Sequence, residues 1–192
     1  MDISRREALH LLGYRRKDAV PPSNVERLLD RELKIGRELL RFKGIYRKCD
    51  AVVGDDTVIA GGEYRIRSRR FASWITGCGE IYLFVVTAGQ LFSERVQELL
   101  ELEDTSGALA ADAVGSSAAE CAARAADEYL RSLEPDCRMT KRYSPGYGDW
   151  NITDNRSLLE FIDAGDIGIT VNEGGLMLPE KSVSAAKGIF RL

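Results

Sequence analysis

Apolar side chains recur at helical spacing near the start of the chain. Residues 4–12 carry alanine and leucine at that spacing after Ser4, which is placed to cap a helix, and Gly13 ends the pattern. Two prolines then precede residues 23–40, where aliphatic side chains alternate with a charged face and Ser23 is placed as the cap. The pattern therefore predicts two helices within residues 1–43.

In residues 44–66 the helical pattern gives way to short runs of β-branched and aromatic residues. Gly-Asp-Asp and Gly-Gly sequences separate these runs, which is typical of antiparallel hairpins. Residues 68–76 then predict a short helix. The side chains that this helix should bury are Phe71, Trp74 and Ile75. The apolar stretch at residues 80–87 predicts a central strand that is buried on both faces.

Helical spacing returns after the central strand. Two of the predicted helices cover residues 93–102 and 108–133, and a further one carries Leu158, Leu159, Phe161 and Ile162. Thr153 or Asp154 is placed to cap the last of them. Small residues at positions 115–117 allow a close neighbour, and packing of their helix on a sheet is the simplest explanation. Short strands are predicted at residues 138–143, 167–171, 176–178 and 183–190, with a turn at residues 144–146.

The composition is that of a globular protein. Hydrophobic residues make up 44% and charged residues 30% of the 192 residues, which is enough for a core without disulfides. Lys and Arg number 27 against 30 Asp and Glu, and the net charge of -3 argues against a general nucleic-acid partner. The longest apolar run, residues 81–88, is too short to span a bilayer, and the N-terminus lacks the apolar segment of a secretory signal. We therefore expect a cytoplasmic protein without a nucleic-acid or membrane partner.

Generic motifs for a catalytic or metal centre are missing from the sequence. The cysteines lie far apart, at Cys49, Cys78, Cys121 and Cys137. His10 is the single histidine, so neither a metal site nor a histidine-based nucleophile is predicted. There is no nucleophile elbow or phosphate-binding loop, and the carboxylates show no spacing that singles out an acid/base pair. These patterns are typical of a binding module, and whether it counts as an enzyme stays open.

The most informative segment is residues 142–190. It begins R-Y-S-P-G-Y, continues through a short helix to G-I-T-V-N-E, places Met177 two residues before Pro179, and closes with S-V-S at residues 182–184. This order of blocks resembles the activation domain of cobalamin-dependent methionine synthase. A weaker likeness covers residues 112–120 and residues 77–89.

The resemblance implies a single α+β domain over residues 1–192, with a twisted, mainly antiparallel sheet flanked by helices. Residues 1–43 would form its helical part, and residues 44–192 its sheet and ligand turn. The implied function is to bind S-adenosylmethionine and to assist reductive remethylation of a corrinoid-dependent methyltransferase such as methionine synthase. The implied partners are that methyltransferase and an electron donor. Cobalamin is expected on the partner alone, because Ala8 stands where a D-x-H-x-x-G corrinoid motif around His10 would need its aspartate.

The resemblance also assigns ligand contacts. The candidates are Glu120, Arg142, Tyr143, Ser144, Pro145, Gly146 and Tyr147. Arg142 matches the arginine that binds the ligand's carboxylate, a group that suits a planar guanidinium. Glu120 aligns with the acidic residue that binds the ammonium. Peptide groups of Tyr143 and Ser144 would read the adenine edges, and the ring of Tyr147 would cover the ligand.

Simpler interpretations stand beside these assignments. Glu120 fits an ordinary solvated helix residue, Tyr147 fits a core aromatic, and Trp150 is expected to pack in the core. Asp18 is the candidate by position for the family's early acidic ligand. The family's late tyrosine contact is expected to be missing, because the chain ends at Leu192. The same fold could therefore bind another small molecule, or serve as a ligand-free scaffold subunit of a methionine synthase that lacks this domain.

Overall fold

Two units make up the chain in the computed structural model, which describes residues 2–16 and 20–191. Unit 1 comprises residues 1–43, 87–125 and 179–182, and unit 2 comprises residues 44–86, 126–178 and 183–192. Asp18 lies outside the described residues. The interpretation of residues 1–192 as one module stays a prediction.

Unit 1 is helical. It contains α1 (Arg5–Leu11), α2 (Ser23–Leu39), α4 (Leu91–Glu101) and the first part of α5 (Thr105–Ser132). Ser4 caps α1 as predicted, because its side chain accepts a hydrogen bond from the Glu7 N–H. Ser23 is not the cap of α2. It is the first helical residue, and Pro22 precedes it without a side-chain hydrogen bond.

The small residues of α5 bring other helices close to it. A Cβ on Gly115 would lie 3.1 Å from Phe92 Cβ of α4, and the Ser117 hydroxyl donates to the Ser4 carbonyl (3.0 Å) at the start of α1. The expected packing of this stretch on a sheet is therefore corrected for unit 1. There the small residues serve helix-on-helix packing around Leu29 and Phe92.

A buried carboxylate ties two helices of unit 1 together. Glu32 of α2 is 1% exposed and accepts from the guanidinium of Arg31 (2.7 Å) and twice from that of Arg95 on α4 (3.1 Å). The hydrogen bond to Glu32 is the main cause that raises the pKa of Arg95. Burial of this charge is tolerated because its lone pairs are filled by cationic donors.

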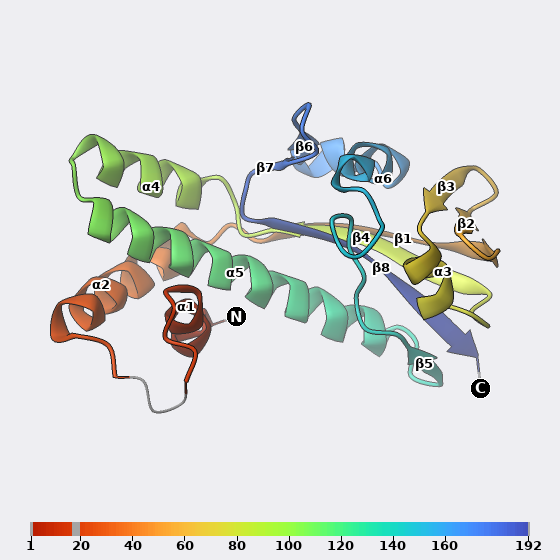
Figure 1. Ribbon diagram of the computed structural model, residues 1–192, viewed down its shortest axis with the longest axis horizontal. Helices are drawn as coiled ribbons and strands as arrows, with labels where there is room; N and C mark the ends of the chain where they lie inside the picture. Colours follow the sequence, from red (N-terminus) through yellow and green to blue (C-terminus); the bar gives the residue numbers. More distant parts are fainter. Residues whose placement is uncertain (1, 17–19, 192) are drawn as a thin grey trace. The chain divides into compact units, whose positions relative to one another are not determined.

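Unit 2 is built on a six-stranded sheet with the order β3-β2-β1-β4-β8-β5 (Figure 1). The strands are β1 (Lys43–Val53), β2 (Thr57–Ala60), β3 (Tyr64–Arg67), β4 (Glu80–Thr87), β5 (Cys137–Met139) and β8 (Ser182–Arg191). The pairs β1–β2, β2–β3 and β5–β8 are antiparallel. The predicted α+β fold, with its mainly antiparallel sheet and hairpins in residues 44–66, is confirmed.

The central strand β4 sends side chains to both faces of the sheet. Ile81 and Leu83 pack in a core with α3 (Arg69–Trp74) and α6 (Asn155–Phe161). Tyr82 points to the other face, where its hydroxyl donates to Glu134 (2.9 Å) just after α5. Burial on both faces is therefore confirmed for this strand.

Several local predictions in unit 2 need correction. Trp74 is 47% exposed, because its indole N–H reaches out to the Lys141 carbonyl (3.2 Å) while Phe71 and Ile75 fill the core side of α3. Asp154 makes no side-chain cap on α6. It ends the short helix η1 (Ile152–Asp154), which is capped by Asn151.

The remaining strands are shorter than predicted. β6 (Thr170–Val171) and β7 (Met177–Leu178) form a separate two-stranded ladder. Residues 167–169, which were predicted to begin the strand that includes β6, are instead the last residue of the helical turn η2 (Ala164–Ile167) followed by Gly168 and Ile169. Of the strand predicted over residues 138–143, only residues 138 and 139 lie in a regular strand, β5 (Cys137–Met139).

The Glu32 interaction gives a stability prediction. Glu32→Gln keeps the side-chain volume but removes the charge to which Arg31 and Arg95 donate. We expect a loss of about 1.5–3 kcal/mol, the range for hydrogen bonds to charged groups, in urea unfolding. The control is Glu38→Gln on the exposed side of α2, which should change stability by less than about 0.5 kcal/mol. Equal effects of the two variants would contradict the assignment.

Candidate functional site

Residues 142–150 form a turn that begins beside β8. The Tyr143 N–H donates to the Ala186 carbonyl (3.0 Å), and the Ala186 N–H donates back to the Tyr143 carbonyl (2.8 Å). The Tyr147 N–H donates to the Ser144 carbonyl (3.1 Å), and Gly146 has a φ of 92°, which favours glycine. The turn predicted at residues 144–146 is confirmed.

Trp150 holds this turn against the core of unit 2. Its side chain is 1% exposed and stacks on Phe71, with ring centroids 5.0 Å apart, and on Tyr143 at 6.3 Å. Its carbonyl also accepts from the Gly146 N–H (2.8 Å). The core role predicted for Trp150 is confirmed.

Asp149 ties the turn to the start of α3. Its carboxylate accepts from the Ser68 hydroxyl (2.5 Å) and from the Arg69 N–H (2.9 Å). The Ser68 hydrogen bond is the main cause that lowers the pKa of Asp149 below its ordinary value. The turn is thus fixed at both ends, by the strand pairing of Tyr143 and by the carboxylate of Asp149.

Charged groups gather where Arg142 leaves the strand. Antiparallel register from the Tyr143–Ala186 bridge places Arg142 opposite Lys187 of β8. Asp127 of α5 meets both cations: its Oδ1 accepts from Lys187 Nζ at 2.8 Å, and its Oδ2 lies 3.9 Å from Arg142 Nε. Lys187 is fully buried, whereas the side chains of Arg142 and Asp127 are partly exposed.

The predicted site residues differ in what they can offer to a ligand. Tyr147 is 62% exposed, so the alternative of a core aromatic is wrong. The N–H and the carbonyl of Tyr143 already pair with Ala186. For its predicted contact with an adenine edge, Tyr143 therefore has only the second lone pair of its carbonyl oxygen left. The Ser144 N–H makes no hydrogen bond within the described residues. Pro145 is buried and shapes the turn.

Glu120 and the turn belong to different units. Glu120 is half-buried on the part of α5 in unit 1, and residues 142–147 lie in unit 2. The acidic residue that meets Arg142 within unit 2 is Asp127, two helical turns beyond Glu120 on α5. Sequence reasoning missed Asp127 and Lys187. A lysine in the apolar run S-V-S-A-A-K-G-I-F was the available signal, because a buried charge needs a partner.

Two buried polar atoms beneath the turn have unused hydrogen-bonding capacity. Among the described residues, the Tyr143 hydroxyl and the Trp150 indole N–H have no partner. Gly148 lies beside the first of these, since a Cβ at that position would overlap the Tyr143 hydroxyl. A bound water or ligand group would satisfy such atoms.

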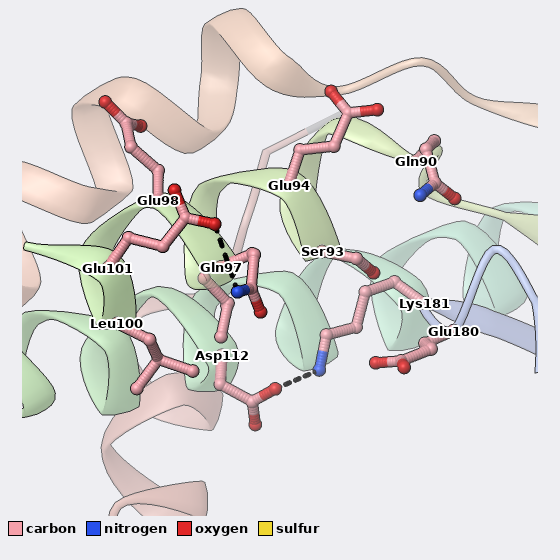
Figure 2. Close-up of a pocket in the computed structure, with 11 residues that line it drawn as sticks. Gln90, Ser93, Glu94, Gln97, Glu98, Leu100, Glu101, Asp112, Glu180 and Lys181 are labelled. Carbon is pink, nitrogen blue, oxygen red and sulfur yellow. Dashed lines mark hydrogen bonds and ion pairs between the residues drawn. The ribbon is translucent and has the colours of Figure 1, made fainter.

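A cavity separate from the turn lies in unit 1, between α4, α5 and the segment before β8 (Figure 2). It has a volume of about 600 Å³, and none of the predicted site residues lines it. Lys181 donates there to Asp112 (2.5 Å) and Ser116 (3.0 Å). The lining of this cavity is acidic. Beside Lys181, which is paired with Asp112, its charged side chains are all carboxylates, from Glu94, Glu98, Glu101, Asp112 and Glu180.

The residues that the structure describes offer neither a metal-binding cluster nor a membrane-spanning helix. No group of three His, Cys, Asp or Glu side chains there could hold a metal ion. No helix in the same ranges has the length and apolarity to cross a membrane. The four cysteines are free thiols, and burial raises the pKa of Cys78 to about 11.

Comparison with solved structures identifies the fold. A crystal structure of the MetH reactivation domain bound to AdoHcy matches this chain with a TM-score of 0.70 at 15% sequence identity, over 90% of this chain and 67% of the other. The chain has the fold of that reactivation domain. This confirms the activation-domain likeness predicted from the order of motifs in residues 142–190. No protein-family model matches the chain. No curated protein matches it in sequence.

Trp150 gives a prediction for the turn. Trp150→Ala should destabilise the protein by about 3–5 kcal/mol, the usual cost of removing a large buried aromatic side chain. The matched control is Trp74→Ala, whose exposed ring should cost about 1 kcal/mol, chiefly through its hydrogen bond to the Lys141 carbonyl. Thermal and urea unfolding measure both, and a Trp150→Ala variant as stable as Trp74→Ala would contradict the anchoring role.

The lowered pKa of Asp149 predicts a pH dependence. A carboxyl group whose native pKa lies below its unfolded value of about 3.9 stabilises the fold above that value. This stabilisation is lost as the pH falls through the lowered native pKa. Wild type should therefore be more stable than Asp149→Asn at about pH 6, and the difference should shrink towards about pH 2.5. A difference in unfolding free energy that does not change with pH would contradict this.

Proposed function

We propose that this chain binds S-adenosylmethionine, or its demethylated product S-adenosylhomocysteine (AdoHcy), at the turn of residues 142–147. The observation that carries the proposal is the way this turn presents Arg142, the free N–H of Ser144 and the exposed ring of Tyr147 from one rigid segment. The fold adds support, because a protein with the same fold has been crystallised with AdoHcy.

The chemistry of the residues fits the ligand. Arg142 offers a planar guanidinium to the α-carboxylate, and its ion pair with Asp127 is long enough (3.9 Å) to be exchanged. The Ser144 N–H can donate to a ring nitrogen of adenine. Tyr147 can stack on the purine, since an exposed aromatic ring gains contact area at low entropic cost. The unpartnered Tyr143 hydroxyl adds a polar atom beneath the same turn.

In this proposal the chain works by positioning. When bound, S-adenosylmethionine supplies an activated methyl group, and the acceptor is a reduced corrinoid on a separate partner protein. Arg142 and Ser144 fix the two ends of the ligand, and Tyr147 keeps water from one side of it. No residue of the turn needs to move a proton. We therefore propose a role in reductive remethylation of a corrinoid-dependent methyltransferase, with the electron donor on another chain.

Direct binding tests the first part of the proposal. Calorimetry with AdoHcy and S-adenosylmethionine should give a dissociation constant between micromolar and millimolar, roughly -8 to -4 kcal/mol. Arg142→Ala should weaken binding by about 1.5–3 kcal/mol, and Arg142→Lys should restore only part of it. The control is Arg65→Ala on the exposed side of β3, which should bind like wild type. Absence of heat and of a thermal shift at millimolar ligand would refute binding and favour a scaffold role.

Reactivation tests the second part. The purified chain should be colourless, and His10→Ala should leave its effect unchanged, because His10 is exposed on α1 and is not expected to bind cobalt. Mixed with a corrinoid methyltransferase, a reductant and S-adenosylmethionine, the chain should speed the return of the methylcobalamin spectrum. Cobalamin that copurifies with the chain, and is lost in His10→Ala, would overturn this division of labour.

A further inference from the structure

Four arginines of unit 2 form a compact group of exposed charges. They are Arg65, Arg67, Arg69 and Arg70, and all four are exposed. Within residues 2–16 and 20–191, none of their guanidinium groups makes an ion pair or a hydrogen bond. Arg95 of α4 differs from them, because two carboxylates hold its guanidinium. Positive charge without a counter-ion is therefore concentrated in one short segment of unit 2.

Local structure places these charges where they cost stability. Residues of β3 are alternately buried and exposed, so Arg65 and Arg67 share the outer side of the strand and repel each other. Arg69 and Arg70 occupy the first turn of α3, which contains no acidic residue. The N-terminal end of a helix carries partial positive charge, so cations there are unfavourable. The stability of the chain therefore does not explain these arginines.

The carboxylates beside the arginines are already engaged. Asp149 accepts from the Ser68 hydroxyl (2.5 Å) and from main-chain N–H groups of α3. Asp56 accepts from the hydroxyl of the residue that follows it (2.9 Å). Both line a hollow of about 330 Å³ with Arg67 and Arg69, but neither forms an ion pair with a guanidinium of the described residues. The guanidinium donors can thus receive a carboxylate from another molecule.

Exposed aromatic rings adjoin the arginines. Trp74 lies one helical turn after Arg70 on α3, and both side chains are exposed. The ring of Tyr143 contacts Trp74 (centroids 6.2 Å apart) and the exposed ring of Tyr147 (6.4 Å). A Cβ on Gly148 would lie 2.7 Å from Arg70 Cδ, so Arg70 packs beside the same turn. Arginine, tryptophan and tyrosine are the residues that most often carry the binding energy of protein interfaces.

We propose that this surface docks a partner protein through an acidic face of the partner. We call it the arginine face and define it by Arg67, Arg69, Arg70 and Trp74. Trp74 supplies the apolar centre of the contact, and the guanidinium groups pair with carboxylates around it. The inference goes beyond the proposed function, because it does not require a ligand at residues 142–147.

The charge pattern favours a protein over a nucleic acid as the occupant. Asp56 lies in the hollow between the arginines, where it would repel a phosphate backbone. The whole chain also has a net charge of -3, so its field does not attract a polyanion from a distance. A protein can instead place single carboxylates opposite the arginines and an apolar group opposite Trp74.

A synthetic peptide tests the charge of the partner. The probe is a labelled helical peptide of about 16 residues, with glutamates on both sides of a leucine stripe. In the control peptide, glutamines replace the glutamates. Fluorescence anisotropy at low salt should show the acidic peptide binding about tenfold or more tightly than the control, and sodium chloride should weaken it. Equal affinities, or no binding of the acidic peptide at millimolar concentration, would refute the proposal.

A triple variant locates the binding surface. Arg67→Gln/Arg69→Gln/Arg70→Gln should weaken binding of the acidic peptide about tenfold or more, because it removes the charged donors of the arginine face. The hydrogen bonds to Asp149 come from main-chain N–H groups and are retained. Its unfolding temperature should equal or exceed that of wild type. A clear loss of stability would show that the arginines serve the fold, and would contradict a docking role.

The matched control removes the same charge from unit 1. Arg15→Gln/Arg16→Gln/Arg27→Gln replaces three exposed arginines that lie outside the arginine face. Its affinity for the acidic peptide should stay within about twofold of wild type. An equal loss in both triple variants would show that the peptide responds to net charge alone, and the proposed surface would be wrong.

Tryptophan fluorescence tests the centre of the contact. The chain has two tryptophans, of which Trp74 is exposed and Trp150 is buried. The bound acidic peptide should protect Trp74 from quenching by acrylamide, and Trp74→Phe should abolish this protection. Trp74→Ala should weaken the peptide about fivefold, because an aromatic anchor is lost. Unchanged quenching in the presence of saturating peptide would contradict the central position of Trp74.

Other occupants of the arginine face give different results. A DNA duplex that binds more tightly than the acidic peptide at equal salt, and is lost in the arginine-face variant, would assign the face to nucleic acid and overturn the proposal. Self-association in sedimentation that the same variant abolishes would assign it to a second copy of this chain and overturn it too. We expect neither. Failure of AdoHcy binding would leave these measurements unaffected, because none of them includes that ligand.

Discussion

Two hydrogen bonds between Tyr143 and Ala186 place the candidate site. They extend the pairing along the edge of β8 that β5 occupies, past the end of β5. Because side chains alternate along a strand, neighbouring residues then point to opposite faces of the sheet. Tyr143 turns to the core of Phe71 and Trp150, and Arg142 turns to Asp127 of α5. A single backbone pairing thereby provides both the aromatic support and the charged end of the site.

The turn after Tyr143 is held rigidly although much of it faces solvent. Trp150 is buried in an aromatic stack, and Asp149 fills its lone pairs with donors from Ser68 and the first N–H groups of α3. The residues between these anchors, Gly146 and Tyr147, are exposed. A segment that is fixed at its ends and open in its middle pays little entropy on binding, which suits a module that acts by positioning.

Much of the fold could be read from the chain itself. The helical stripe in residues 23–40, the hairpins in residues 44–66 and the strand at residues 80–87 each follow from local periodicity and turn chemistry. The Pro-Gly turn follows in the same way, because proline sets φ at one position and glycine supplies a positive φ at the next. The order of motifs after Arg142 also indicated the fold of the reactivation domain.

Tertiary structure decided what the side chains meet. Met139 pairs with Ile189 and Tyr143 with Ala186, so one residue between them is extra, and this bulge sets the face to which Arg142 points. Trp74 is exposed because its indole N–H meets the Lys141 carbonyl, 67 positions further along the chain, while Phe71 and Ile75 fill the core side of its helix. Asp154 is not a cap because it ends the short helix that Asn151 caps. Asp127 and Lys187 are 60 positions apart along the chain, so no local pattern could join them. Local sequence therefore determined which elements form, and the contacts between distant segments determined which charges face one another.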